Sequence, residues 1–225
     1  MSIHTMIRNY IFRKYAKGGL IMSNYIVINN QRIELTEEQV KQFATALNIG
    51  SPTIQLSEIA VGDTFKIVEH EFIVLAQSGD TTEVIRKDLL PNQAFGDTNN
   101  FDGSAVGETC YKFAAEIAAI IGGENIIEHT VDLTSDDGLK DYGTVKSRCS
   151  LLTADMYRFY VEILDKFKPD SWWWLATPFS TKRHDNDSWV KCVSPSGCFD
   201  DYYYDDDYLG VRPFCILKST IFVSK

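Results

Sequence analysis

One stretch of this chain, Trp172 to Phe214, constrains the fold more than any other part of the sequence. It begins with three consecutive tryptophans and ends with Gly210-Val211-Arg212-Pro213-Phe214. Residues 183–208 between these ends contain seven Asp and four Tyr, with Arg183 and Lys191 as their only Lys or Arg, so their net charge is −5. Bulky apolar ends predict buried strands, and a polar and aromatic insert between them predicts an exposed surface on a rigid base.

We expect this insert to carry ligand-binding residues, because Tyr supplies rigid contact area at a low entropy cost. Trp189 and Lys191 alternate along a predicted strand and therefore share one of its faces. The candidate ligand-binding residues are Arg183, His184, Asp185, Asn186, Asp187, Trp189, Lys191, Asp200, Asp201, Tyr202, Tyr203, Tyr204, Asp206 and Tyr208. Replacing the four tyrosines of this set with Ala is expected to abolish binding and to leave the melting temperature nearly unchanged.

The two ends of the stretch are interpreted as structural. A run of tryptophans, here Trp172 to Trp174, offers a stacking platform for sugars, but core packing explains it better because each ring buries a large area. Arg212 lies between apolar residues, which favours a structural arginine paired inside the fold over an anion site.

Composition limits the partners of the chain. Its 225 residues correspond to one domain, or one domain with a small appendage. The net charge of −9 argues against binding to nucleic acid or to an anionic membrane surface, since both need Lys and Arg. No run of 18 apolar residues is present, so membrane insertion is not expected. We expect a protein that is cytoplasmic as synthesised, or associated with a virion.

The first 21 residues differ from the rest, with four basic residues and no acidic one. They lack the apolar core and the cleavage site of a signal peptide. Codons for Lys17 to Met22 can contain a bacterial ribosome-binding sequence just before a start codon. We therefore hypothesise that residues 1–21 are a non-native or disordered leader and that translation starts at Met22, which would change the net charge to −13. The intact mass of the protein from its native host tests this.

Residues 22–56 are predicted to form a separate N-terminal module. Tyr25 to Ile28 and Arg32 to Leu35 read as a β-hairpin around Asn29-Asn30. Thr36 and Gln39 then form the capping box of a helix. A hairpin and one helix are too small to be stable alone, so we expect this module to dock on the main domain or on a partner.

Residues 57–225 are predicted to form the main domain. Strands are expected at 65–68, 72–76 and 82–86. Ser104 caps a predicted helix that ends at Gly122-Gly123. The predicted core face of this helix consists of Val106, Cys110, Phe113, Ile117 and Ile120.

A second helix is predicted to begin after the cap Thr153 and to be stopped by Pro169. Its predicted core stripe consists of Met156, Phe159, Tyr160, Ile163 and Phe167. A weak strand is expected at 126–131, and Asp136-Asp137-Gly138 marks a turn. Residues 188–193 and 198–203 are predicted to form a hairpin around Pro195-Ser196-Gly197.

Four short motifs in the C-terminal half carry a family resemblance: Trp173-Trp174-Leu175-Ala176-Thr177-Pro178, Trp189-Val190, Ser196-Gly197 and Gly210-Val211-Arg212-Pro213. Their order resembles a C-type-lectin-like domain. The chain is most similar to an uncharacterised family of gut Firmicutes and prophages, which includes variable proteins of diversity-generating retroelements. The resemblance covers residues 59–224. It implies an α+β, C-type-lectin-like fold with two main helices and short antiparallel strands, whose C-terminal loops display a ligand-binding face.

The residues of the insert also suit diversification by such a retroelement. These elements mutate template adenines, often in AAY codons for Asn, and the products include Asp, Tyr, His and Ser. Residues 184–188 and 200–208 have this composition, with Trp189 as a neighbour that AAY codons do not reach. Lys191 is not reached either, and we expect both residues to be fixed or differently encoded. Tyr and Asp are also common in binding loops of any origin.

Metal binding and catalysis find little support in the sequence. The aspartates at 200–201 and 205–207 would offer oxygens to Ca²⁺, but the triplets of calcium-dependent lectins are missing, so we interpret the run as a solvated face and expect no metal or cofactor. No catalytic motif is present, and no catalytic residue is expected. The five cysteines are expected to be free thiols. Cys192 and Cys198, which would face each other across the predicted hairpin, leave open a relation to the copper-dependent sulfatase-activating oxidases.

The sequence thus predicts a non-enzymatic display protein that binds a protein or a cell-surface ligand through its C-terminal loops. The alternative is a phage or prophage tail-associated subunit for receptor binding. In that case the N-terminal module would mediate virion assembly, and homo-oligomerisation through the same module is also open.

Overall fold

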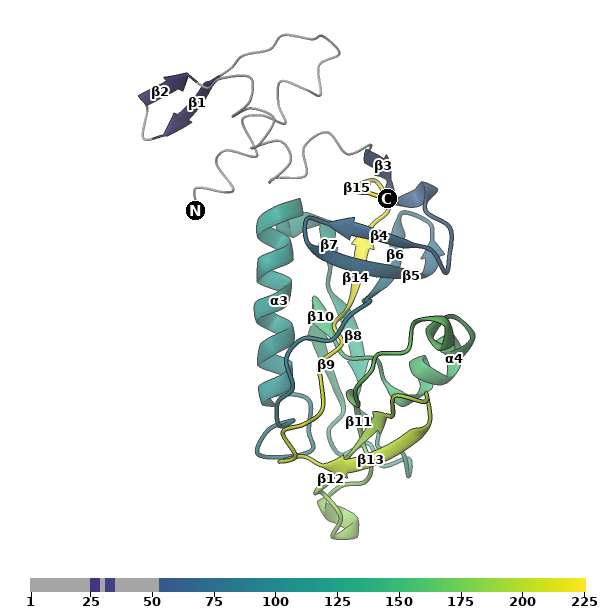
Figure 1. The fold of residues 1–225 in the computed structure, drawn as a ribbon. Helices are drawn as coiled ribbons and strands as arrows, with labels where there is room; N and C mark the ends of the chain where they lie inside the picture. The colour runs from purple at the N-terminus through teal and green to yellow at the C-terminus, as the bar shows by residue number, and fades with distance from the viewer. Residues whose placement is uncertain (1–24, 29–30, 35–52) are drawn as a thin grey trace. The chain divides into compact units, whose positions relative to one another are not determined.

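The computed structural model describes residues 25–28, 31–34 and 53–225 of the chain (Figure 1). It divides into two compact units, one of residues 1–53 with Ser224, the other of residues 54–223 with Lys225. Two long helices and several antiparallel sheets make this an α+β protein, as the sequence predicted at that level. Among the described residues, no helix is long and apolar enough to cross a membrane.

The first unit contains one described element pair. Strand β1 (Tyr25–Ile28) pairs antiparallel with β2 (Gln31–Glu34), which confirms the predicted hairpin. The predicted leader, residues 1–21, and the predicted helix after Thr36 lie outside the described residues.

The second unit is built on an eight-stranded sheet with the order β10-β14-β6-β5-β4-β15-β3, with β7 also paired to β14. The three strands predicted near its start are confirmed. The strands of the sheet are β3 (Thr53–Gln55), β4 (Thr64–Ile67), β5 (His70–Ser78), β6 (Thr81–Arg86), β7 (Ile126–Ile127), β10 (Cys149–Ser150), β14 (Phe214–Lys218) and β15 (Phe222–Ser224).

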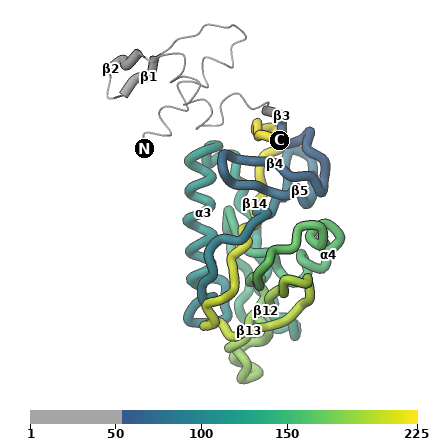
Figure 2. Tube along the Cα trace, in the orientation of Figure 1, coloured from purple at the N-terminus to yellow at the C-terminus, as the bar shows by residue number. Residues whose placement is uncertain are grey.

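Core clusters cover both faces of this sheet at β5, where successive side chains point to opposite faces. In β5, Phe72 and Val74 belong to a core cluster shared with helix α3 (Ala105–Ile121), whereas Ile73 and Leu75 belong to a cluster shared with helix α4 (Ala154–Leu164). Figures 1 and 2 show the consequence, with α3 on one side of the sheet and α4 on the other.

Helix α3 has the predicted boundaries. The Ser104 hydroxyl accepts a hydrogen bond from the Gly107 N–H at 3.0 Å, and the helix ends at Gly122, whose φ of 93° is accessible to glycine. The predicted face is confirmed by the burial of Val106, Cys110, Phe113 and Ile117, with Ile120 partly buried.

Helix α4 begins as predicted, with the Thr153 hydroxyl accepting from the Met156 N–H at 3.2 Å. Its predicted core stripe is confirmed in part. Tyr160 is buried, and Met156, Ile163 and Phe167 are partly buried against the same core cluster. Phe159 is wrong, because it is 79% exposed, and the buried residues Ala154, Tyr157 and Leu164 were not predicted. Apolar side chains cover much of the circumference of this helix, so several of its faces have apolar residues three or four positions apart. The face that packs on the sheet is the one that contains Tyr157. A 3-10 turn, η3 (Asp165–Phe167), follows before Pro169.

A second, three-stranded sheet has the order β11-β12-β13. Its strands are β11 (Trp173–Pro178), β12 (Trp189–Val193) and β13 (Phe199–Tyr203), and the last two form the predicted hairpin. Within the second unit this sheet lies at the opposite end from the β4–β5 hairpin (Figure 1).

The remaining elements are short. Strands β8 (His129–Asp132) and β9 (Thr144–Ser147) form an antiparallel ribbon. The weak strand expected at 126–131 is thus divided between β7 and β8. Asp136 and Asp137 form the predicted turn, closed by a hydrogen bond from the Gly138 N–H to the Ser135 carbonyl at 2.8 Å. The other 3-10 turns are η1 (Leu56–Glu58), η2 (Gly123–Asn125) and η4 (Lys182–His184).

Candidate functional site

The two apolar ends of the Trp172–Phe214 stretch are bonded directly to each other. The Gly210 N–H donates to the Trp172 carbonyl at 2.8 Å, and the Trp174 N–H donates to the Gly210 carbonyl at 3.1 Å. A Cβ at Gly210 would lie 2.6 Å from a side-chain carbon of Leu89, so this close approach favours glycine. We call these two hydrogen bonds the clamp. They fix the points at which the chain enters and leaves the candidate site.

Two buried tryptophans of β11 lie next to the clamp. Trp173 and Trp174 are both fully buried, and the Trp174 indole N–H donates to the Gln93 carbonyl at 2.9 Å. Their interpretation as core residues is confirmed. Trp172 is half-buried, and its ring meets the ring of Tyr202 edge to face at 5.0 Å.

Arg212 is the second support of the clamp, and its predicted structural role is confirmed. The side chain is 1% exposed, and its guanidinium donates to the carbonyls of Arg86, Lys87 and Phe167 at 3.0, 3.0 and 2.9 Å. It also lies 5.1 Å from the centre of the Trp173 ring. Burial lowers the pKa of Arg212 to about 10, so the group still carries its charge at neutral pH.

An aromatic pair occupies the rim of the β12–β13 hairpin. The register sets Trp189 opposite Tyr203, and their ring centres are 3.9 Å apart with planes inclined by 32°. Tyr203 is 47% exposed. Trp189 is half-buried, so its ring holds the exposed ring of Tyr203 in place. An exposed ring fixed in this way presents a preformed apolar contact surface, which is an arrangement suited to binding.

The other three tyrosines of the insert differ in exposure. Tyr202 and Tyr204 are half-buried and pack against the core. Tyr208 is exposed and meets Tyr202 edge to face at 5.2 Å. Desolvation, together with a hydrogen bond to Tyr202, raises the pKa of Tyr208 well above its usual value, so it stays a neutral phenol. Replacing all four tyrosines would therefore remove packing as well as exposed contact area.

The insert that contains the aromatic pair is also rich in aspartates. Asp201 is paired with Lys191 at 3.2 Å. Within residues 53–225 no salt bridge joins the other aspartates of the insert to a basic group; we call them the unpaired aspartates, and they are Asp185, Asp187, Asp200, Asp205, Asp206 and Asp207. They give this end of the unit a negative field that favours a cationic or polar partner.

Lys191 does not lie on the exposed surface where we expected it. The residue is 7% exposed, with its ammonium 3.2 Å from Asp201 and 3.6 Å from Asp136. The same ammonium lies over the ring of Phe199, 5.2 Å from its centre. Two carboxylates and an aromatic face compensate the loss of water, which explains why a lysine on the same strand face as Trp189 is buried.

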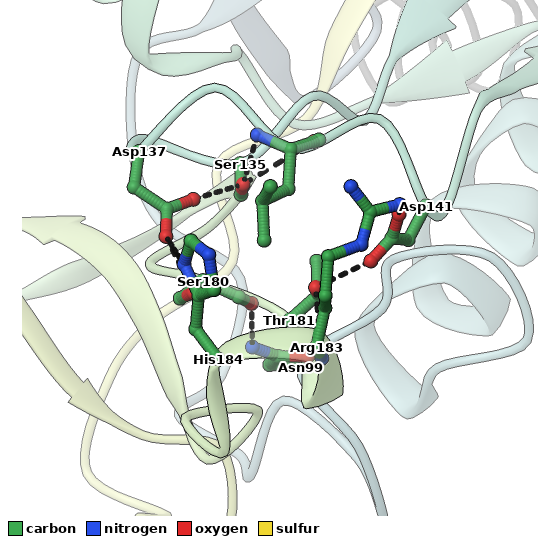
Figure 3. A network of polar contacts seen from close by, with 9 residues as sticks. Asn99, Ser135, Asp137, Asp141, Ser180, Thr181, Arg183 and His184 are labelled. Atoms are coloured by element: carbon green, nitrogen blue, oxygen red, sulfur yellow. Dashed lines mark hydrogen bonds and ion pairs between the residues drawn. The ribbon is translucent and has the colours of Figure 1, made fainter.

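The loop before β12 is held by a polar network that the sequence did not predict (Figure 3). His184 Nδ1 lies 2.9 Å from Asp137, and Arg183 forms an ion pair with Asp141. Ser180 and Thr181 donate hydrogen bonds of 2.6 Å to the same two aspartates, respectively. The loop that carries Arg183 and His184 is therefore fixed by the segment around the Asp136-Asp137-Gly138 turn, the one sequence feature that pointed to this region.

Asp137 is the centre of that network. Partial burial by itself would raise its pKa, but hydrogen bonds from Ser135, Ser180 and His184 lower the pKa well below its usual value. Asn99 completes the network by donating to the Ser180 carbonyl at 2.9 Å and to the Trp189 carbonyl at 3.1 Å. These bonds join the loop to the strand that carries the aromatic pair.

Next along the loop, Asp185 adopts a left-handed conformation with φ of 51°, which Asp tolerates better than most residues. Asp185 is exposed, and Asn186 and Asp187 are half-buried. The structure thus gathers most candidate residues on one end of the second unit, with Lys191 inside it.

The cysteines are all free thiols in the structure. The register sets Cys192 opposite Asp200, so Cys192 and Cys198 are not cross-strand partners as we had considered. Cys192 is buried, and desolvation raises its pKa well above the usual value, whereas Cys198 is exposed. The structure does not bring the two thiols together in the way that a shared copper site would require.

Comparisons with the profiles of known protein families, with curated proteins and with solved structures give no match for this chain.

Proposed function

We propose that this protein is a non-enzymatic ligand-binding protein with a C-type-lectin-like fold, whose C-terminal loops bind a protein or a cell-surface ligand. The observation that carries the proposal is the aromatic pair on the β12–β13 hairpin, where the exposed ring of Tyr203 lies against the half-buried ring of Trp189, in an insert that also contains the unpaired aspartates. Exposed, preorganised aromatic rings are typical of residues that dominate binding energy.

The finer fold assignment is supported by the motif order around the clamp and by the two helices on opposite faces of the sheet. The proposal that the protein is a variable protein of a diversity-generating retroelement is supported by the distribution of residue types. Residues that adenine mutagenesis produces lie in the loop at 184–188 and in the exposed or half-buried run at 200–208. Between them, β12 contributes Val190 and Cys192 to the core.

Sequencing the locus from several related strains tests the retroelement proposal. We expect substitutions to concentrate at 184–188 and 200–208, and a nearby near-copy of the 3′ end to differ at adenines. Trp174, Val190 and Cys192 should stay unchanged, because any polar replacement there would be buried. Substitutions spread equally over these buried positions would contradict the proposal.

A binding experiment tests the site itself. We would apply the full chain to arrays of cationic, neutral and acidic peptides and of glycans, and compare it with the double variant Trp189→Ala/Tyr203→Ala. Phe159→Ala is the matched control, since this ring is also exposed but lies on α4. We expect the double variant to lose array binding and to keep its melting temperature within about 3 °C.

Two results would contradict the binding site. Array binding that survives in the double variant would show that the aromatic pair is not the contact surface. A large fall in melting temperature would show that the two rings stabilise the fold. A structural role would then explain the pair without any ligand.

A second candidate function is that of a phage or prophage tail-associated subunit that binds a receptor. It is favoured by the β1–β2 hairpin, which belongs to a compact unit of its own and so suits an assembly contact. Tail genes beside this gene, and detection of the chain in purified virions with an antibody, would support it. The two functions are compatible, because the first concerns the loops of the second unit.

A further inference from the structure

A second polar cluster lies in the second unit, at the turn of the β4–β5 hairpin. His70 Nε2 is 3.1 Å from a carboxylate oxygen of Glu116 on α3 and 3.8 Å from a carboxylate oxygen of Glu69. All three ligand atoms lie within 4.8 Å of one another. Figure 1 shows the hairpin turning beside α3, far from the β12–β13 hairpin.

The imidazole of His70 is the unusual member of this cluster. The residue is 7% exposed, and its ring is held edge to face against Phe113, with ring centres 5.3 Å apart. Its Nδ1 is buried and has no hydrogen-bond partner among the described residues. Within residues 53–225, the polar contacts of this buried ring are the 3.1 Å hydrogen bond between Nε2 and Glu116 and the longer approach of Glu69.

The charges of the cluster favour a cation. Two carboxylate oxygens within 4.8 Å of each other repel. The imidazole can form a hydrogen bond with Glu116 at 3.1 Å, but the oxygen of Glu69, at 3.8 Å, is too far away for one. A divalent ion between the three atoms would bond to all of them. The side chains of Glu69 and Glu116 are 66% and 53% exposed, so water can complete the coordination of such an ion.

The distances match such an ion. Tetrahedral bonds of about 2.0–2.1 Å to nitrogen and oxygen place neighbouring ligand atoms roughly 3.3–3.4 Å apart. The two distances from His70 Nε2, 3.1 and 3.8 Å, lie on either side of that value. Imidazole with carboxylates suits Zn²⁺ and related transition ions, whereas Ca²⁺ and Mg²⁺ prefer oxygen alone. We propose that Glu69, His70 and Glu116 form a binding site for a divalent transition-metal ion such as Zn²⁺.

The ion would join two elements that are distant in the sequence. His70 opens β5 and pairs with Ile67 across a two-residue turn, and Val68 in this turn has a φ of 56°. Glu116 lies on α3, 46 residues further along the chain from His70. A bound ion would therefore cross-link the hairpin to the helix and stabilise the second unit. This site is independent of the proposed ligand-binding face.

Titration of the full chain without an affinity tag tests the proposal. We would measure Zn²⁺ binding by calorimetry and Co²⁺ binding by visible absorption, with Glu69→Gln, Glu116→Gln and His70→Gln as variants. Glu108→Gln is the matched control, because Glu108 lies on the same helix and pairs only with Lys112 at 2.8 Å among the described residues. Circular dichroism would verify that each variant folds.

We expect one ion per chain, an affinity at least about tenfold weaker in Glu69→Gln and Glu116→Gln, and no change in Glu108→Gln. Zn²⁺ should raise the melting temperature of the wild type and of the control more than that of the two site variants. If His70→Gln does not fold, the two glutamate variants still decide the question. Affinity that is unchanged in both of them, or no saturable binding below about 100 μM Zn²⁺, would overturn the proposal.

Discussion

Arg212 offers the most direct test of how the candidate site is supported. Its guanidinium joins the carbonyls of Arg86 and Lys87, at the end of β6, to the carbonyl of Phe167 after α4. Replacing Arg212 with Ala leaves these acceptors without their donor and removes the contact with the Trp173 ring. We therefore predict that this single change strongly destabilises the second unit.

The magnitude follows from the contacts. Three carbonyls at about 1 kcal/mol each and one cation–π contact at about 1 kcal/mol give a loss of about 4 kcal/mol for Arg212→Ala. Arg212→Met restores most of the volume but no donor, and should lose about 3 kcal/mol. Arg212→Lys keeps the charge, yet one ammonium does not reproduce the planar fork that reaches all three carbonyls, so we expect a loss of about 2 kcal/mol.

Urea unfolding followed by tryptophan fluorescence measures these losses. All four tryptophans lie in the second unit, so the signal reports on this unit alone. With a slope of about 2 kcal/mol per molar urea, Arg212→Ala should lower the midpoint by about 2 M. The exposed Arg148→Ala serves as the control and should change the free energy of unfolding by less than about 0.5 kcal/mol. An Arg212→Met variant as stable as the wild type would refute the reasoning. It would show that Arg212 stabilises the unit by filling volume and not by its hydrogen bonds.

Two further predictions concern charged groups near the candidate site. Because the pKa of Asp137 is lowered in the folded state, its contribution to stability is present above the ordinary value of 3.8 and is lost as the pH falls below it. The difference in unfolding free energy between the wild type and Asp137→Asn should therefore shrink between about pH 5 and pH 2, and a constant difference in urea titrations would contradict this. Lys191→Met leaves Asp136 and Asp201 facing each other and should destabilise by about 2 kcal/mol, with part of the loss recovered by adding Asp201→Asn. A double variant no more stable than Lys191→Met would show that the carboxylate of Asp201, left without its partner, is not the cause of the loss.

Local chemistry made parts of the fold predictable from the sequence. Ser104 and Thr153 identify helix starts because their hydroxyls satisfy free backbone N–H groups within three residues. The β12–β13 hairpin is likewise marked by its turn and its alternating residues. Such features are decided by neighbours in the chain, so the sequence alone contains enough information to place them.

Contacts between distant segments were not predictable in the same way. The buried face of α4 depends on the sheet that it meets, and this is why Phe159 was misplaced. Lys191 is buried because Asp136, 55 positions earlier in the numbering, lies beside it. The pairing of His184 with Asp137 spans 47 residues. A single sequence does not show which polar residues will meet over such distances.

The clamp at Gly210 has a consequence for how this protein can change. The clamp already holds together the two ends of the segment from Trp174 to Gly210. The entropic cost of closing this segment therefore depends only weakly on its length and rises by about 0.6 kcal/mol for each doubling. Loops grafted between η4 and β12, or beyond β13, should therefore be accepted without loss of the underlying architecture. The same geometry would make this end of the molecule a natural scaffold for engineered recognition libraries.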